Sequence, residues 1–181
     1  MKIPPSYLAF TSRFKGHVRA IVTTVVVDIS STVSKALGIH ARQALEYNAI
    51  WDTGATGSVI TPTVVDALSL KPIGKQGVAG VTGTKEADVY LIDLALPNKV
   101  IVQDVRVVAL PLNAEGVDVL IGMDIILAGD MAISNSEGHT TFSFCIPPVG
   151  NPIDLVAKAD HANQRAAKKK IRELKKLKNR K

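Results

Sequence analysis

The division of the apolar residues into short runs separated by turn residues is the feature that most constrains the fold. Residues 17–29, 100–110 and 117–121 are rich in valine and isoleucine, which favour extended strands. Thirteen glycines and nine prolines punctuate the chain, and both residue types promote turns. With 46% apolar residues in 181, such strands can bury one sizeable core. The pattern therefore predicts a mainly β domain.

A few other elements are expected around these strands. Residues 61–70 read as a short helix, which Thr61 can cap and in which Pro62 fits the first helical position. A mixed connection over 30–48 includes a helical turn at 41–48. Residues 77–96 contain three glycines between extendable residues and predict a hairpin with a glycine-rich tip. A last hairpin is predicted within 131–146.

The charge of the chain is concentrated at its C-terminal end. Residues 155–181 hold eleven Lys and Arg against two acids, a net +9, so that the preceding residues carry −3 of the total +6. Three prolines between 147 and 152 break regular structure before this segment. We therefore expect a domain over 1–150 and a basic tail over 151–181, either an amphipathic helix or disordered.

Several classes of protein are disfavoured by composition. A single cysteine, Cys145, supports neither a disulfide framework nor a multi-cysteine metal site, and the four histidines are scattered, so we expect no metal and no cofactor. The longest apolar run, 20–27, is too short to span a bilayer. The start of the chain shows no secretory signal, and we expect a cytoplasmic protein with no membrane contact.

Residues 50–60 read I-W-D-T-G-A-T-G-S-V-I and place Asp52 directly after an apolar approach. Asp-Thr-Gly makes a good turn, since aspartate bonds its own backbone and glycine accepts a positive φ. Two further elements of the sequence bear on the role of Asp52. A glycine-tipped hairpin is predicted about 25 residues later, and an apolar run closed by glycine, 119–122, follows about 70 residues after Asp52.

The order of these three elements resembles the retropepsin-like aspartic proteases, which carry D-T-G-A, then a flap, then an apolar-apolar-Gly segment. The resemblance covers roughly residues 17–147. It implies a closed, mainly β acid protease fold with one lobe per chain, and an endopeptidase that hydrolyses extended peptides. It implies catalytic roles for Asp52, Thr53 and Gly54.

The chemistry of such a site needs a second carboxylate. Two carboxylates about 3 Å apart cannot both ionise, so they share one proton; one form activates water and the other polarises the scissile carbonyl. No second D-T-G or D-S-G occurs in this chain. A symmetric homodimer would bring Asp52 from each subunit to the two-fold axis. Asp124 is a rival partner, although it also fits as the N-cap of a helix.

The resemblance also implies substrate-binding residues. The predicted hairpin corresponds to the flap, which would close over a peptide and exclude water. Its tip would be formed by Gly80, Val81, Thr82 and Gly83, and the candidate subsite walls are Ala55, Val81 and Ile121.

Two departures from the retroviral pattern concern substrate grip and dimer contacts. Retroviral enzymes usually have an acid soon after D-T-G-A, where this chain has Thr56 and Gly57, and they often have Arg or Asn after the apolar-apolar-Gly, where this chain has Met123. The L-I-G-M-D form is more similar to cellular or bacterial members.

Two functions of other classes stay open from the sequence alone. One is a peptide-binding module on the same fold that does not cut. The other is nucleic-acid binding through residues 158–181, because a segment of high positive charge attracts phosphates; without stacking aromatics such contact would be weak and of poor specificity.

Overall fold

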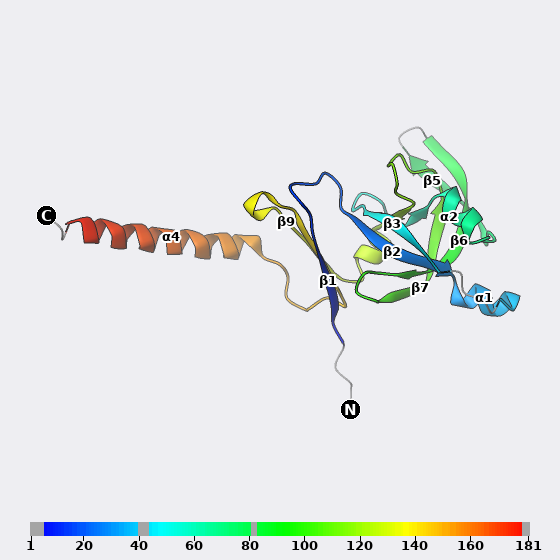
Figure 1. Cartoon of the computed structure of the whole chain (residues 1–181), viewed down its shortest axis with the longest axis horizontal. Coiled ribbons are helices and arrows are strands. Elements are labelled where there is room, and N and C mark those ends of the chain that lie inside the picture. Colours follow the sequence, from blue (N-terminus) through cyan, green and yellow to red (C-terminus); the bar gives the residue numbers. More distant parts are fainter. Residues whose placement is uncertain (1–5, 40–43, 81–82, 179–181) are drawn as a thin grey trace, which may run out of the picture. The chain divides into compact units, whose positions relative to one another are not determined.

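The computed structural model describes residues 6–39, 44–80 and 83–178 and divides the chain into two compact units (Figure 1). The first unit ends at Val149 and the second begins at Gly150. The first is mainly β, as predicted. The second consists largely of one helix.

The elements of the first unit follow one another in an order dominated by strands. The strands are β1 (Leu8–Arg13), β2 (Val22–Ile29), β3 (Leu45–Trp51), β4 (Val59–Ile60), β5 (Gly74–Gly80), β6 (Gly83–Ala95), β7 (Ile101–Ala109), β8 (Val119–Ile121), β9 (Asp130–Ser134) and β10 (Thr141–Ile146). The helices are α1 (Ser31–Leu37), α2 (Pro62–Ala67), α3 (Met123–Ile126) and the 3-10 turn η1 (Ser136–Gly138).

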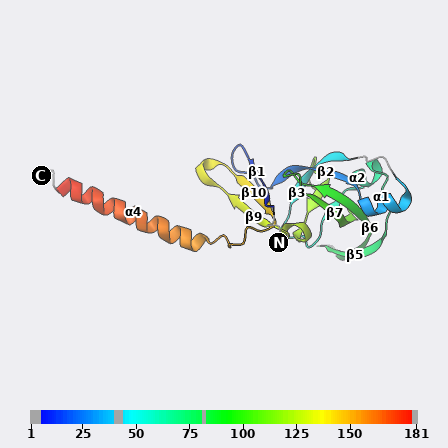
Figure 2. The ribbon, with the colours of Figure 1, turned by 90° about the horizontal axis from the view of Figure 1, so that it is seen from below.

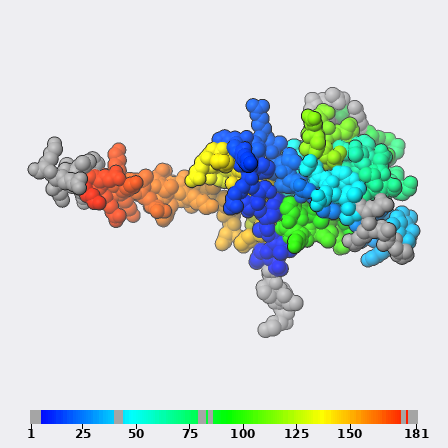
Figure 3. All heavy atoms as spheres, viewed as in Figure 1, coloured from blue at the N-terminus to red at the C-terminus, as the bar shows by residue number. Residues whose placement is uncertain are grey.

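Six strands close into a barrel in the order β2-β3-β8-β4-β7-β6, because β2 also pairs with β6. Strand β5 extends this sheet as the outer partner of β6, and the two form a long hairpin (Figure 1). A separate three-stranded sheet runs β1-β10-β9. Its β1 and the β9–β10 hairpin, dark blue and yellow in Figure 3, meet on the face shown. This architecture confirms the predicted retropepsin-like fold.

The core is built from the inward side chains of the barrel and is aromatic at one end. Trp51, the last residue of β3, packs against Phe142 and Phe144 of β10, with ring centroids 4.9 and 4.8 Å away. Its indole nitrogen donates a 2.9 Å hydrogen bond to the hydroxyl of Thr23 on β2. The three-stranded sheet is thereby fixed to the barrel strand that leads into the D-T-G loop.

The structure confirms some of the predicted elements and corrects others. Helix α2 begins at Pro62 as expected, but the Thr61 hydroxyl does not cap it and instead donates to Asp118 at 2.8 Å. The helical turn predicted at 41–48 is wrong over 45–48, because β3 occupies 45–51, and its residues 41–43 lie outside the described residues. The helix of this connection, α1, lies earlier, with Ser30 accepting from the amide of Val33 as its cap.

Carboxylates and hydroxyls join α1 to the barrel where β2 meets β6. Asp93 on β6 is buried; it accepts from the amide of Asp104 on β7 and from the amide and hydroxyl of Ser31. Asp104, at a bulge with φ of 53°, accepts from the hydroxyls of Ser30 and Thr32. These bonds, that of Ser30 first, hold the pKa of the Asp104 carboxyl below its usual range.

The second unit contains α4 (Leu155–Lys178), a single uninterrupted helix of 24 residues (Figure 2). Asp154 caps it by accepting from the amides of Val156 and Ala157 at 2.9 and 3.2 Å. Of the two states expected for the tail, the helix is therefore correct. No helix among the described residues is long and apolar enough to cross a membrane.

The carboxylate of Asp104 is expected to stabilise the fold above about pH 4 and to lose this effect in more acidic solution. A group whose pKa is lowered by folding adds stability above its unfolded pKa, about 3.9, and loses it as pH falls through the lower folded value. Asp104→Asn keeps a side chain that tolerates positive φ. We expect its urea midpoint to lie below that of the wild type at pH 7, and the difference to shrink below about pH 4.

Glu115→Gln is the control, because Glu115 is exposed and has no hydrogen bond of its side chain in the described part of the chain. A midpoint difference for Asp104→Asn that stays constant across this pH range would contradict the role assigned to the charge.

Candidate active site

The loop of residues 52–58 connects β3 to β4, and β8 lies between these two strands. Strand β8 pairs with β3 in parallel and with β4 antiparallel, so it lies between the two ends of the loop. The amide of Asp52 donates to the carbonyl of Ile121 at 3.0 Å, and the amide of Met123 donates to the carbonyl of Ala55 at 2.8 Å. These two bonds hold the start and the middle of the loop against the end of β8.

Asp52 is half-buried at the mouth of this loop. Its Oδ1 accepts from the amide of Gly54 at 2.8 Å, the bond expected of an Asp-Thr-Gly turn. A Cβ at position 54 would lie 3.1 Å from that oxygen, so glycine lets the backbone approach the carboxylate closely. The two interpretations of Asp-Thr-Gly, a turn and a catalytic loop, are therefore compatible, because the turn holds the Asp52 carboxylate at the mouth of the loop.

Asp124 is held by Ser58 and has a different environment. Its Oδ2 accepts from the Ser58 amide at 3.0 Å, and its Oδ1 accepts from the Ser58 hydroxyl at 2.8 Å and from the Ile125 amide at 3.0 Å. The Ser58 hydroxyl in turn accepts from the Gly122 amide at 3.1 Å. Gly122, not Asp124, occupies the cap position of α3, so the predicted N-cap is wrong. Asp124 instead ties α3 to the loop.

Gly122 lies against the backbone of the loop at the same crossing. A Cβ built there would come within 2.6 Å of the carbonyl carbon and oxygen of Gly57 and 3.1 Å of the carbonyl oxygen of Ala55. Its φ of −94° is one that any residue adopts. The glycine is therefore required by space and not by backbone conformation.

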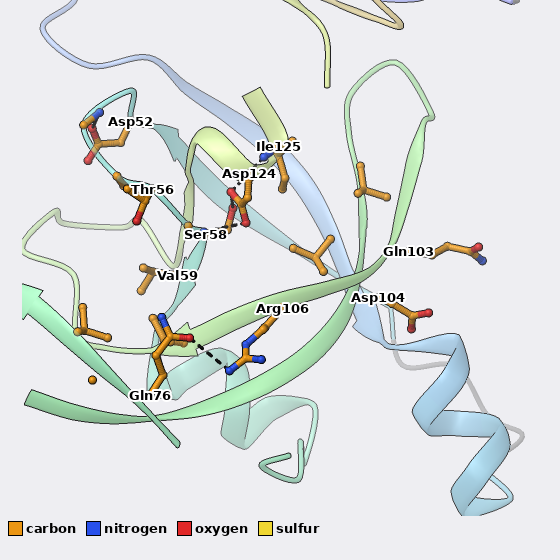
Figure 4. A pocket seen from close by; sticks show the side chains of 18 residues that line it. Asp52, Thr56, Ser58, Val59, Gln76, Gln103, Asp104, Arg106, Asp124 and Ile125 are labelled. Atoms are coloured by element: carbon orange, nitrogen blue, oxygen red, sulfur yellow. Dashed lines mark hydrogen bonds between the residues drawn. The ribbon is translucent and has the colours of Figure 1, made fainter. Parts of the chain in front are cut away.

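A cleft of about 1010 Å³ runs from Asp52 along the loop to the β5–β6 hairpin and β7 (Figure 4). Its lining comprises Asp52, Gly54, Ala55, Thr56, Gly57, Ser58, Val59, Gln76, Gly77, Val78, Val102, Gln103, Asp104, Val105, Arg106, Val108, Asp124 and Ile125. In Figure 4, Asp52 lies apart from the Ser58–Asp124 pair, with Thr56 between Asp52 and Val59. The cleft is long enough to offer several contacts besides Asp52.

The sequence-predicted residues fall into three groups. Asp52, Gly54 and Ala55 line the cleft. Thr53 is exposed beside it, and its hydroxyl has no partner in the ranges that the structure describes. Ile121 is fully buried in the core and meets the loop through its carbonyl, so its prediction as a subsite wall is wrong. Inward orientation in a barrel strand explains the error.

The predicted flap tip is described only in part. Gly80 and Gly83 form the last pair of the β5–β6 ladder, and Val81 and Thr82 lie outside the described residues. The hairpin contributes Gln76, Gly77 and Val78 to the cleft. The hairpin itself is confirmed, and its residues 76–78 had not been recognised as cleft residues.

The family match agrees with this geometry. Residues 42–125 match a family model described as aspartyl protease. This segment contains the D-T-G loop, the β5–β6 hairpin and the β8 crossing. Over residues 42–125, the chain belongs to the retropepsin-like aspartic protease family.

Solved structures with similarity to this retropepsin-like chain include bacterial and viral proteases. A retropepsin-like aspartic protease from Rickettsia conorii is 9% identical, with 80% of this chain and 99% of that chain covered and a TM-score of 0.47. The EIAV protease with an inhibitor is 19% identical over 60% and 86% of the two chains, with a TM-score of 0.42. The simian foamy virus (mac) protease is 19% identical over 58% and 92%, with a TM-score of 0.38. No curated protein sequence matches.

Substitution of Gly122 tests whether its close contact with the 52–58 loop stabilises the fold. Gly122→Ala places a methyl group against backbone atoms that cannot rotate away, and overpacking of this kind costs about 2 kcal/mol. We expect this loss in the free energy of unfolding measured by urea denaturation.

Gly57→Ala is the matched control, because a Cβ at Gly57 would meet nothing within 4 Å. It should stay within about 0.5 kcal/mol of the wild type, as surface substitutions do. Equal losses in the two variants would show that the close contact at Gly122 is not the cause.

Proposed function

We propose that this retropepsin-like chain is an aspartic endopeptidase, active as a homodimer in which Asp52 of each subunit contributes one carboxylate. The observation that carries the proposal is the position of Asp52: half-buried at the mouth of a long cleft and held by the Gly54 amide. One carboxylate presented in this way is half of an acid protease site.

The other acids of the cleft are poor candidates for the second half. Asp124 accepts three hydrogen bonds from Ser58 and Ile125, and Asp104 accepts from Ser30 and Thr32. A second copy related by a two-fold axis would instead supply an identical Asp52, whose second carboxylate oxygen accepts no hydrogen bond from the described residues. The exposed Thr53 hydroxyl, which the family resemblance directs to the partner loop, would then gain an acceptor.

The chemistry follows from two carboxylates that share one proton. The ionised carboxylate removes a proton from a water molecule between the two, and the water oxygen attacks the scissile carbonyl carbon. The protonated carboxyl donates to the carbonyl oxygen. The tetrahedral intermediate then collapses, its C–N bond breaks and the amine nitrogen takes a proton. The pair titrates as one unit, so no single pKa belongs to either Asp52.

The β5–β6 hairpin is the proposed flap. Its residues 76–78 already line the cleft, and its backbone can pair with an extended peptide. Closure would exclude water other than the reacting molecule. The tip residues Gly80, Val81, Thr82 and Gly83 stay predictions as substrate contacts. Cytoplasmic location likewise stays a prediction.

Replacement of the Asp52 carboxylate tests the proposal directly. Asp52→Asn keeps the shape and the bond from Gly54, but the amide cannot take a proton from water. We expect wild type to cleave members of a diverse peptide library between about pH 4 and 7.5, and the variant to lose about 10³-fold or more in kcat/KM. Circular dichroism and sedimentation should be unchanged.

Mixing the two proteins tests whether both carboxylates are needed. After subunit exchange between equal amounts, about half of the wild-type chains would sit in mixed dimers. Activity should therefore fall to about half, whereas an unrelated carrier protein leaves it unchanged. Undiminished activity would favour a monomeric site. Peptide binding without cleavage by the wild type would favour the non-catalytic module, which the intact Asp52–Gly54 turn disfavours.

We propose as a second function that α4 contacts nucleic acid through its phosphates. Basic side chains recur at intervals of three or four residues along the helix and are all exposed: Lys158, His161, Arg165, Lys168, Arg172 and Lys176. With 3.6 residues per turn, this spacing forms one stripe about 25 Å long. Asp160 and Glu173 fall outside the stripe.

The remaining faces of α4 favour nucleic acid over a membrane. Helices that lie on membranes need bulky apolar or aromatic residues opposite their charges. The apolar residues of α4 include several alanines, among them Ala159 and Ala166, and the exposed bulky side chains Val156 and Ile171 lie far apart along the helix, which contains no aromatic residue. A stripe of basic side chains with so few bulky apolar residues beside it fits a polyanion.

The salt dependence of binding tests the stripe. The full-length chain should bind a 20-base-pair duplex of mixed sequence with an affinity that falls steeply with salt. In a variant with Lys168, Arg172 and Lys176 changed to Gln, the slope of log K against log salt should drop by about two to three. A control with Lys15, Arg19 and Lys71 changed to Gln loses the same charge from the first unit.

Equal losses in these two variants, or tighter binding to vesicles of anionic lipid than to the duplex, would overturn the second function.

A further inference from the structure

We propose that Arg106 makes this protease select substrates with an acidic side chain at a subsite removed from the scissile bond. The inference rests on the proposed function, because it names the substrate class of the same cleft. It concerns a residue to which the family motifs give no role.

The alternation of β7 directs Arg106 into the cleft. Val105 and Val107 belong to the buried core of the barrel, and of these two only Val105 also reaches the cleft, whereas Arg106 and Val108 both line it. Successive side chains of a strand point to opposite faces. Arg106 is therefore placed on the substrate side by the register that buries its two neighbours.

The Arg106 guanidinium makes few hydrogen bonds with the described residues of its own chain. Its Nη2 donates one long hydrogen bond, 3.4 Å, to the Oε1 of Gln76 on β5 (Figure 4). It has no ion pair with a carboxylate in the part of the chain that the structure describes. Because guanidinium carries five donors in a planar fork, most of its hydrogen-bonding capacity is open to a ligand.

The acids of the cleft are already committed elsewhere. Asp124 accepts its hydrogen bonds from Ser58 and Ile125 and lies against α3. Asp104, two residues before Arg106, faces Ser30 and Thr32. Arg106 is also the sole cation among the described residues that line the cleft. An incoming carboxylate would find one partner of opposite charge there.

The surroundings of Arg106 strengthen such a pair. Val59, Val78 and Val108 line the cleft around it and belong to one small apolar cluster. A charge pair beside apolar walls, covered by a bound peptide, is screened less than a pair in open water. The fork of Arg106 can hold a carboxylate through two parallel hydrogen bonds.

The position of Arg106 limits which substrate residue it can meet. Figure 4 shows Thr56 and Val59 between Asp52 and Arg106. The acidic residue is therefore not the one whose carbonyl is attacked, but one bound further along the peptide. A two-fold dimer presents Arg106 twice, so peptides with an acid on each side of the cut, at equal distances from it, should be the best substrates.

The test compares peptides that differ only by Glu or Gln at single positions. Wild type should show a kcat/KM about tenfold higher for Glu at one position on each side of the cut, which corresponds to the weaker charge-assisted hydrogen bonds. Arg106→Gln should have about equal kcat/KM values for the Glu and Gln peptides, and it should still cut the Gln peptides. Arg106→Glu should reverse the preference toward Lys.

Lys75→Gln is the matched control, since Lys75 is exposed on the same strand as Gln76, lies outside this cleft and faces Glu86 at 4.0 Å. It removes one positive charge and should keep the preference for Glu. A wild type without this preference, or an unchanged preference in Arg106→Gln, would overturn the inference.

Binding separates this inference from the proposed catalysis. Fluorescence anisotropy of the same peptides on Asp52→Asn, with and without Arg106→Gln, needs no cleavage. If no peptide is cut but Glu peptides bind about tenfold more tightly and lose this in the double variant, the proposed catalysis fails and the role of Arg106 stands. Equal binding of Glu and Gln peptides would overturn that role.

Discussion

The fold depends on the passage of β8 between the two ends of the 52–58 loop. The Asp52 amide bonds to Ile121, the Met123 amide bonds to Ala55, and the Gly122 amide bonds to the Ser58 hydroxyl. Buried polar groups must be paired, so the loop cannot shift along β8 without leaving donors unsatisfied. The close approach of Gly122 to Gly57 is what allows all three bonds at once. The barrel thus sets the position of Asp52 through backbone contacts.

The backbone position of Asp52 is also constrained by the preceding residue, Trp51. Its ring packs on Phe142 and Phe144 from the three-stranded sheet, and its nitrogen bonds to Thr23. Because Trp51 immediately precedes Asp52, the backbone enters the loop from a residue with little freedom. The aromatic content of the chain is only 4%, yet four of these residues, including Phe10, gather here. Preorganisation of this kind is what a carboxylate pair requires.

Local patterns predicted β2, β7, β8, the α2 start at Pro62 and the hairpins, because each of these depends on residues near in sequence. They also predicted the Asp-Thr-Gly turn, in which the Gly54 amide donates to Asp52. They could not reveal β1, whose partner β10 lies about 130 residues away, or that the Thr61 hydroxyl donates to Asp118 instead of capping α2. Ile121 was misassigned and Arg106 overlooked because strand register, set by the closed barrel, decides which side chains face the cleft.

Asp52 in the D-T-G loop and Asp124 in the L-I-G-M-D segment show how the environment of a carboxylate decides its role. Asp124 receives donors at both oxygens from its own chain, so it has little capacity left for water or substrate. In the described part of the chain, the Asp52 side chain accepts one hydrogen bond, from the Gly54 amide, and its other oxygen has no partner there. A carboxylate saturated by its own chain stabilises structure, whereas one that is presented with an open edge can share a proton with a second carboxylate. The same contrast distinguishes Arg106, with one long bond, from a cation committed to an ion pair.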